Sequence, residues 1–281
     1  MTRICIFGAG AIGGYLAAAL DNAGAAVSLV ARGPHLEAIL KNGLTFEKDG
    51  VTSTHHLPAS SDPADLGPQD VVFLAVKAHG IPAIIDGLKP LLHNDTIIVP
   101  AVNGLPGWYF HGAGTGTALD GQPLLAVDPD RRIWDEIGPQ RAIGCVVYPA
   151  CEIAAPGYVR HLDGDRFSLG EPSGERTDRI RDLSALMIAG GLKAPVRPRI
   201  RDEIWIKLWG NCSFNPVSAL TGATLDEIGN DPGSRQLVTD IMTEVQAIGE
   251  AAGARFGVSI DKRIAGATAI VGHKPSTRQD I

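Results

Sequence analysis

The chain has 281 residues, enough for roughly two domains at about 150 residues each. Its 25 Lys and Arg residues against 31 Asp and Glu residues give a formal net charge of −6, without the basic runs of nucleic-acid or anionic-membrane binders. The 34 glycines and 19 prolines are fewer than in disordered low-complexity chains. We therefore expect a folded protein that acts on a small molecule, with neither nucleic acid nor membrane as a partner.

The cysteine and histidine spacings predict no metal site and no disulfide framework, because neither a CxxC nor an HExxH pattern occurs. The apolar run at the N-terminus breaks at Gly8, too early for a signal peptide, and no later stretch of 18 apolar residues could span a membrane. These features predict a cytoplasmic protein.

The first part of the chain alternates short apolar runs with segments of helical periodicity. The predicted strands are 3–7, 26–31, 70–76 and 96–101, and the predicted helices are 11–24, 34–42 and 79–92. The pair Asp49-Gly50 predicts a hairpin in the segment between the helix 34–42 and the strand 70–76. This alternation is typical of an α/β fold with a doubly wound parallel sheet of the Rossmann type.

Residues 103–141 form an excursion rich in glycine and proline, after which 142–153 and 158–171 resemble sheet strands. The pattern then changes to helices alone, predicted at 177–190, 202–222, 233–253 and 260–271. We therefore expect a Rossmann-type domain over residues 1–173 and an all-helical domain over residues 174–281.

The sequence GAGAIG lies directly between the first predicted strand and the first predicted helix. Gly8 permits a tight turn, Gly10 lets a pyrophosphate approach the backbone, and Gly13 lets the helix pack closely on the sheet. We expect these three glycines, together with Ile12, to bind a dinucleotide.

The identity of the dinucleotide depends on the end of the second strand. NAD-binding domains place an acidic residue there to hold the ribose hydroxyls, whereas this chain has Ala31 and Arg32. A guanidinium pairs well with a 2′-phosphate, so the sequence favours NADP(H), with NADPH as the cofactor. The alternative is that Arg32 is an ordinary solvated surface residue.

A polar stripe runs along the otherwise apolar segment 203–220. Its members are Lys207, Asn211, Asn215 and Ser218, which a continuous helix places within an arc of about 80°. Burying such groups without partners is costly, so the stripe should face either a polar cleft or a hydrogen-bond network between domains. An exposed Lys207 is a third alternative.

Two further candidates follow predicted strands. Asn103-Gly104 comes after the strand 96–101, and Lys77 comes after the strand 70–76, so both belong to the carboxyl edge where open parallel sheets bind ligands. Asn103 could instead serve only as a turn residue, and Lys77 could be solvated. The remaining histidines, including His55 and His56, have no partner pattern and are expected at the surface.

Several of these segments together resemble the ketopantoate reductase (2-dehydropantoate 2-reductase) family. They are GAGAIGG (8–14), Arg32, LAVKA (74–78), VNG (102–104) and IKLWGNCSFNPVSAL (206–220). The resemblance implies NADPH-dependent reduction of ketopantoate to pantoate, in pantothenate and coenzyme A biosynthesis, by a Rossmann domain with a helical partner domain. It further implies that Lys207 is the general acid and that Asn103, Asn211 and Asn215 contact substrate or cofactor.

In that family a serine of a Ser-x-x-Gln-Asp segment binds the substrate carboxylate, and PSTRQD (275–280) points to Ser276. The family continues to a Thr-Glu-Ile-Asp segment, whereas this sequence ends at Ile281, so we expect a truncated chain. Reduction of another 2-keto acid and a catalytically silent NADPH-binding protein remain alternatives. The excursion could alter which 2-keto acid fits, and the apolar helical domain permits a homodimer.

Overall fold

The computed structural model describes residues 1–269 and Gly272, and the chain divides into two compact units. Unit 1 comprises Met1–Gly114 and Ala118–Ile200, and unit 2 comprises Thr115–Thr117 and Arg201–Ile281. The division after Ile200 comes later than the boundary that we expected between residues 173 and 174.

The reason is the packing of helix α4 (Asp178–Ala189) against helix α1 (Ala11–Asn22). The contact is so close that a Cβ added to Gly190 would lie 2.1 Å from the carbonyl oxygen of Ala19. The first of the helices predicted after residue 174 therefore completes the α/β unit.

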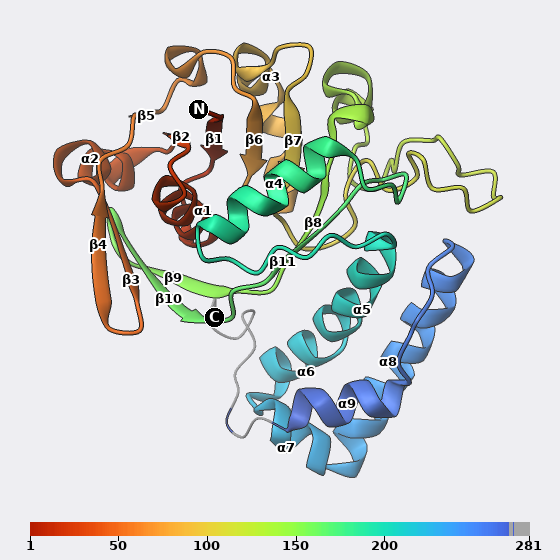
Figure 1. Ribbon diagram of the computed structural model, residues 1–281. Coiled ribbons are helices and arrows are strands. Elements are labelled where there is room, and N and C mark those ends of the chain that lie inside the picture. Colours follow the sequence, from red (N-terminus) through yellow and green to blue (C-terminus); the bar gives the residue numbers. More distant parts are fainter. Residues whose placement is uncertain (270–271, 273–281) are drawn as a thin grey trace. The chain divides into compact units, whose positions relative to one another are not determined.

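The centre of unit 1 is a five-stranded parallel sheet in the order β5-β2-β1-β6-β7 (Figure 1). The strands are β1 (Arg3–Phe7), β2 (Ala26–Val30), β5 (Ala59–Ser60), β6 (Val71–Leu74) and β7 (Ile97–Pro100). This arrangement confirms the doubly wound parallel sheet, although the short strand β5 was not predicted.

Both faces of the sheet are buried, as the short apolar runs predict. Side chains of a strand alternate between faces, so Ile4 and Ile6 join the core formed with α1, whereas Cys5 and Phe7 join the core on the other face. Burial raises the pKa of the Cys5 thiol to about 12, so this cysteine remains an apolar core residue.

Two smaller sheets complete unit 1. One has the order β4-β3-β10-β9 and the other pairs β8 with β11. The strands are β3 (Leu44–Lys48), β4 (Val51–His55), β8 (Gly144–Val147), β9 (Ala150–Ala155), β10 (Tyr158–Asp163) and β11 (Phe167–Gly170). The hairpin at Asp49-Gly50 is confirmed: both residues have positive φ, 53° and 75°, as a tight two-residue turn requires.

The prediction of a helix over 79–92 is largely wrong. The structure has short 3₁₀ turns there, interrupted by one α-helical turn, α3 (Ile85–Leu88). Pro82 and Pro90 lack the N–H groups that a continuous helix needs, and they instead lie at the first and second positions of separate 3₁₀ turns. By contrast, α2 (Gly33–Asn42) agrees with the prediction.

Unit 2 is helical in its described part. Its helices are α5 (Ile200–Cys212), α6 (Phe214–Thr221), α7 (Leu225–Asn230), α8 (Pro232–Ala251) and α9 (Ile260–Thr268). The single helix predicted over 202–222 is two helices that meet at Ser213, whose hydroxyl donates a hydrogen bond to the carbonyl of Trp209 at 2.6 Å. The break places Pro216 in the first turn of α6, where its missing N–H is tolerated.

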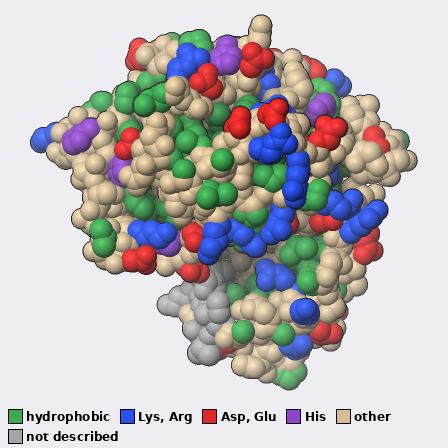
Figure 2. Space-filling model, viewed as in Figure 1, with side chains coloured by type: hydrophobic (Ala, Val, Ile, Leu, Met, Phe, Trp, Pro, Cys, Tyr) green, Lys and Arg blue, Asp and Glu red, His purple; other side chains and the backbone are tan. Residues whose placement is uncertain are grey.

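The surface of the molecule carries charges of both signs. Figure 2 shows Lys and Arg side chains next to acidic ones on one face of the molecule. At the start of α4, Arg179 contacts Glu171 and Arg181 contacts Asp178. Among the residues that the structure describes, no helix has the length and apolar character needed to cross a membrane.

Candidate active site

The carboxyl edge of the central sheet brings together the four candidate positions of unit 1. The last residues of β2, β1, β6 and β7 lie in register, because Phe7 pairs with Val30 and with Leu74, and Leu74 pairs with Pro100. The chain segments that leave these strand ends carry, in the same order across the sheet, Arg32, Gly8, Lys77 and Asn103. Three strand spacings correspond to about 14 Å, which suits an extended dinucleotide with the glycine loop near its middle.

The glycine loop requires glycine at Gly8 and Gly13 for structural reasons. Gly8 has φ +102°, and a Cβ there would lie 3.0 Å from the carbonyl oxygen of Ala75. A Cβ on Gly13 would lie 2.0 Å from the carbonyl oxygen of Gly8, so any side chain would force the loop off the helix. Both residues thus serve the tight turn and the close packing that the motif predicts.

Gly10 is different, because a Cβ added there would meet no atom within 4 Å. Gly10 is the N-cap residue of α1, makes no side-chain cap, and has no acidic residue in the turn that follows. The first N–H groups of a helix lack intrahelical acceptors and carry partial positive charge. The open space at Gly10 is therefore suited to an anionic group such as a pyrophosphate.

His35 holds this loop in place, a role that the sequence did not indicate. Its Nε2 lies 2.7 Å from the carbonyl oxygen of Ala9, and its Nδ1 lies 3.0 Å from the backbone N–H of Gly157. Because the Gly157 N–H donates, Nδ1 must accept, which leaves the proton on Nε2 to be donated to Ala9. A neutral imidazole thus connects the glycine loop to the turn before β10.

The described histidines do not all lie at the surface, as we expected them to. His55 is 4% exposed, and His35, His93, His111 and His161 are half-buried. The His55 ring lies between Asp21 and Ser53, at 2.6 Å and 2.8 Å. The rings of His35 and His55 have partners from distant parts of the chain, which is why local sequence could not identify them.

Arg32 is exposed at the start of α2, where it occupies the N-cap position. No described acidic side chain pairs with it. The residue that precedes it, Ala31, is bound to the carbonyl of Ser60 through its backbone N–H. The guanidinium is therefore available to an added anion at the adenosine end of the edge, as recognition of a 2′-phosphate requires.

Lys77 and Asn103 lie at the other end of the edge, and both are exposed. A Cβ on Gly8 would lie 2.9 Å from the side chain of Val76, so the segment that carries Lys77 packs against the glycine loop. Gly104 has φ +95°, which fits the turn interpretation of Asn103-Gly104. Because this turn follows β7 at the carboxyl edge of the sheet, Asn103 can serve as a turn residue and can also contact a bound ligand.

In unit 2 the apolar side of α5 faces a core, and the polar stripe lies opposite. Trp209 is fully buried, its Nε1 donates to the carbonyl of Met242 at 2.9 Å, and its ring packs on Phe256. The Asn215 Nδ2 lies 3.5 Å from Asn211 Oδ1, so these two amides remain neighbours across the helix break. Lys207 precedes Asn211 by one helical turn on the same side.

The two remaining candidate residues are the serines Ser218 and Ser276. Ser218 does not extend the stripe, because it is fully buried and its hydroxyl donates to the carbonyl of Ala223 at 2.5 Å. Ser276 lies outside the described residues, so its predicted contact with a substrate carboxylate stays a prediction.

Among the described residues no group of three His, Cys, Asp or Glu side chains could hold a metal ion.

The glycine loop, the helix N-terminus and the arginine at the second strand fit NADPH, so the class of protein is a nicotinamide-dependent oxidoreductase. The family model described as Ketopantoate reductase PanE/ApbA matches residues 4–109, and the model described as Ketopantoate reductase PanE/ApbA C terminal matches residues 199–281. The chain belongs to the ketopantoate reductase family. Residues 110–198 lie between the two matched ranges.

Individual relatives agree with this assignment. The chain is 55% identical to a 2-dehydropantoate 2-reductase of Mesorhizobium japonicum, over 99% of this chain and 85% of that protein. The crystal structure of a protein from Ralstonia solanacearum MolK2 assigned to the ketopantoate reductases is 43% identical, with a TM-score of 0.91 over 96% of this chain and 84% of that one. A 2-dehydropantoate 2-reductase structure from Geobacter metallireducens GS-15 is 29% identical, with a TM-score of 0.83 over 99% of this chain and 86% of that one.

Proposed function

We propose that this chain catalyses the NADPH-dependent reduction of 2-dehydropantoate to pantoate, a step of pantothenate and coenzyme A biosynthesis. The observation that carries the proposal is the set of in-register strand ends, which arranges an arginine, a glycine loop, a lysine and an asparagine along one dinucleotide-sized edge. The relative at 55% identity, which bears the name of this reaction, supports the substrate. The cytoplasm is the expected location, and the apolar helical unit permits a homodimer.

NADPH, when bound, supplies the hydride that reduces the ketone carbon. The Lys207 ammonium donates a proton to the ketone oxygen, so the C=O group becomes CH–OH and Lys207 is left neutral until it regains a proton from water. While the oxygen gains negative charge, the same ammonium stabilises it electrostatically. The general acid and the anion-stabilising group are thus one side chain.

The amides and the serine have positioning roles. Asn103, Asn211 and Asn215 orient the keto acid and the nicotinamide, and Ser276 holds the substrate carboxylate. Fixing both reactants in one geometry lowers the entropic cost of bringing them together. Arg32 binds the 2′-phosphate, and Lys77 contacts the nicotinamide side of the cofactor.

Genetic complementation tests the proposed function. A bacterial strain that lacks its own 2-dehydropantoate reduction and requires added pantothenate should grow without it when this chain is expressed, and should not grow with Lys207→Ala. Failure of the folded wild-type protein to support growth would contradict the proposal. Such a protein that still bound NADPH would agree with the catalytically silent alternative.

A further inference from the structure

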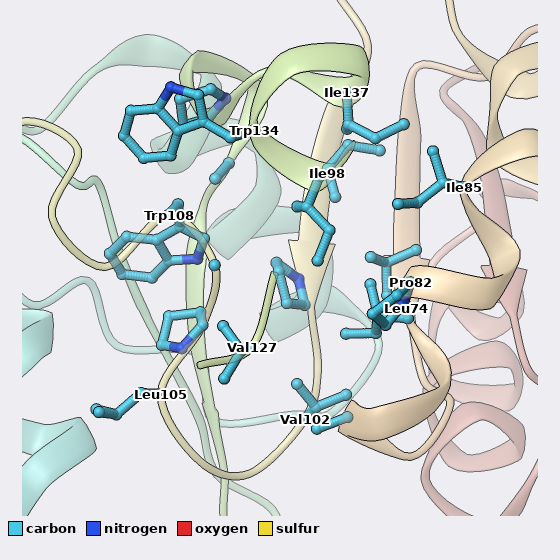
Figure 3. A pocket seen from close by; sticks show the side chains of 18 of the residues that line it. Leu74, Pro82, Ile85, Ile98, Val102, Leu105, Trp108, Val127, Trp134 and Ile137 are labelled. Carbon is cyan, nitrogen blue, oxygen red and sulfur yellow. The ribbon is translucent and has the colours of Figure 1, made fainter. Parts of the chain in front are cut away.

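An apolar pocket occupies the face of the central sheet opposite α1. Its volume is about 400 Å³, within the range of roughly 300–1,000 Å³ that small-molecule sites typically have. Figure 3 shows the rings of Trp108 and Trp134 on one side and Leu74, Pro82 and Ile85 on the other. All of these residues belong to unit 1, so the pocket is a property of that unit alone.

The pocket is lined by apolar side chains and glycine, apart from the imidazole of His79 and the two indole rings. None of the described lining residues is Asp, Glu, Lys or Arg. Burying a carboxylate or a phosphate in such surroundings would be costly, because no opposite charge faces it. The pocket therefore suits an uncharged apolar group.

One wall comes from the excursion, through residues 105–108, 126, 127, 129, 133, 134 and 137–139. The wall is ordered by the buried carboxylate of Asp128, which accepts hydrogen bonds from the backbone N–H groups of Ile133 and Trp134 at 3.1 Å and 2.9 Å. Residues 126–139 lie between the ranges that the two family models match. The part of the wall that residues 126–139 supply therefore lies outside the segments that the two family models describe.

Ion pairs on the outside tie the excursion to the segment that forms the opposite wall. Arg132 contacts Asp86 at 2.8 Å and Glu136 at 2.6 Å, and Lys89 contacts Glu136 at 2.7 Å. The neighbouring Arg132 and Lys89 lower the pKa of Glu136 to about 2, so the carboxylate stays charged at neutral pH. Both walls are therefore held in place before any ligand arrives.

The pocket adjoins the nicotinamide end of the sheet edge. The strand-end residues Leu74 and Pro100 line it, and so do Ala78 and Val102. Ala78 directly follows Lys77 in the chain, and Val102 directly precedes Asn103, the residue assigned to orient the substrate. A keto acid bound at Asn103 can thus extend its side chain into the pocket.

We propose that the pocket receives the side chain of a 2-keto acid that is larger and more apolar than 2-dehydropantoate, with an aromatic or branched aliphatic group. This inference rests on the proposed reductase function and specifies its substrate class. Apolar protein cavities of about 150 Å³ bind benzene, so a pocket of this volume has ample room for an aromatic ring. The hydroxyl of 2-dehydropantoate would find few partners there and would leave much of the space unfilled.

Steady-state kinetics with saturating NADPH test the proposal on pyruvate, 2-dehydropantoate and phenylpyruvate. Burial of the phenyl group should raise kcat/KM for phenylpyruvate at least about tenfold above pyruvate. Val127→Trp fills the pocket from the excursion and should abolish that advantage, while the value for pyruvate changes little. Leu125→Trp is the matched control, because Leu125 is 55% exposed and lies outside the pocket.

The possible results distinguish a failure of the pocket assignment from a failure of the proposed function. A wild-type protein that reduces 2-dehydropantoate but shows no advantage for phenylpyruvate overturns this inference and leaves the proposed function intact. Absence of reduction with every acid overturns both. If Val127→Trp weakens NADPH binding and slows all acids equally, the pocket belongs to the nucleotide, which also overturns the inference.

A second variant covers the case in which Val127→Trp fails to fold. Trp134→Ala enlarges the pocket and preserves the bond between its backbone N–H and Asp128. It should raise kcat/KM for a naphthyl-substituted 2-keto acid relative to phenylpyruvate. An unchanged ratio in the folded variant would contradict the inference.

Discussion

The glycine loop of unit 1 and the polar helix pair of unit 2 are built in opposite ways. The loop is built from backbone, with Gly8 and Gly13 fixed by contacts that leave no room for a Cβ. The helix pair offers side chains, and Asn211 and Asn215 remain neighbours although one helix ends and another begins between them. The proposed function places cofactor binding in unit 1 and proton transfer in unit 2, so we expect substitutions in the two regions to affect different kinetic constants.

The largest expected effect is on the proton donor. Lys207→Ala should lower kcat by about 10²–10⁴-fold, the range for loss of a general acid, while NADPH affinity changes little. Steady-state kinetics and fluorescence titration measure the two quantities. Lys262→Ala, at an exposed lysine of α9, is the matched control and should match wild type. If Lys207→Ala keeps more than about a tenth of kcat where chemistry limits the rate, the polar stripe is structural.

Substitution in the glycine loop should weaken NADPH binding, the quantity that Lys207→Ala leaves nearly unchanged. Gly10→Val should fold, since the added atoms meet open space, but should weaken NADPH binding roughly 100-fold or more, as expected for two lost charge-assisted hydrogen bonds. Gly257→Val, at another glycine with open surroundings, is the control. A Gly10→Val protein with native circular dichroism and wild-type NADPH affinity would refute the phosphate-binding assignment. Gly13→Val should instead fail to fold properly.

Arg32 tests the preference for NADPH within the same region. Arg32→Ala should reduce the ratio of NADPH to NADH affinity by roughly 10- to 150-fold, the value of one charge-assisted phosphate contact. Lys41→Ala, at the exposed far end of α2, should leave that ratio unchanged. Equal binding of both nucleotides by the wild-type protein, measured by fluorescence titration, would disprove the cofactor preference.

His35 should have the smallest effect of the four, because it acts on the loop and not on the ligand. Loss of its two hydrogen bonds in His35→Ala should weaken NADPH binding roughly tenfold and leave kcat at saturating NADPH unchanged. His35→Gln retains a donor and an acceptor and should recover part of the affinity. The control is His56→Ala at an exposed histidine. A fall in kcat without a change in affinity would exclude this positioning role.

The features that the sequence could predict are those with local causes. Gly8 and Gly13 helped to identify the loop because each position leaves no room for a Cβ, and Asp49-Gly50 identified a hairpin because both residues have positive φ. A capping box at Thr224 and Glu227 was also readable and would have predicted α7.

The remaining features depend on contacts between distant segments. His35 bonds to Gly157, which lies 122 residues further along the chain, and α4 belongs to unit 1 through its packing on distant elements such as α1. The pocket beneath the excursion depends on Asp128, whose acceptor role is decided by the fold and not by its neighbours in sequence. Periodicity also failed at 79–92, where the prolines should have carried more weight than the apolar spacing.

The most direct test of the account is a stoichiometric assay with the wild-type protein, NADPH and 2-dehydropantoate, with the product identified by mass spectrometry. The account predicts one pantoate formed for each NADPH oxidised, and a much lower rate with NADH at the same concentration. A protein that binds NADPH but oxidises none of it when 2-dehydropantoate is added would contradict the account.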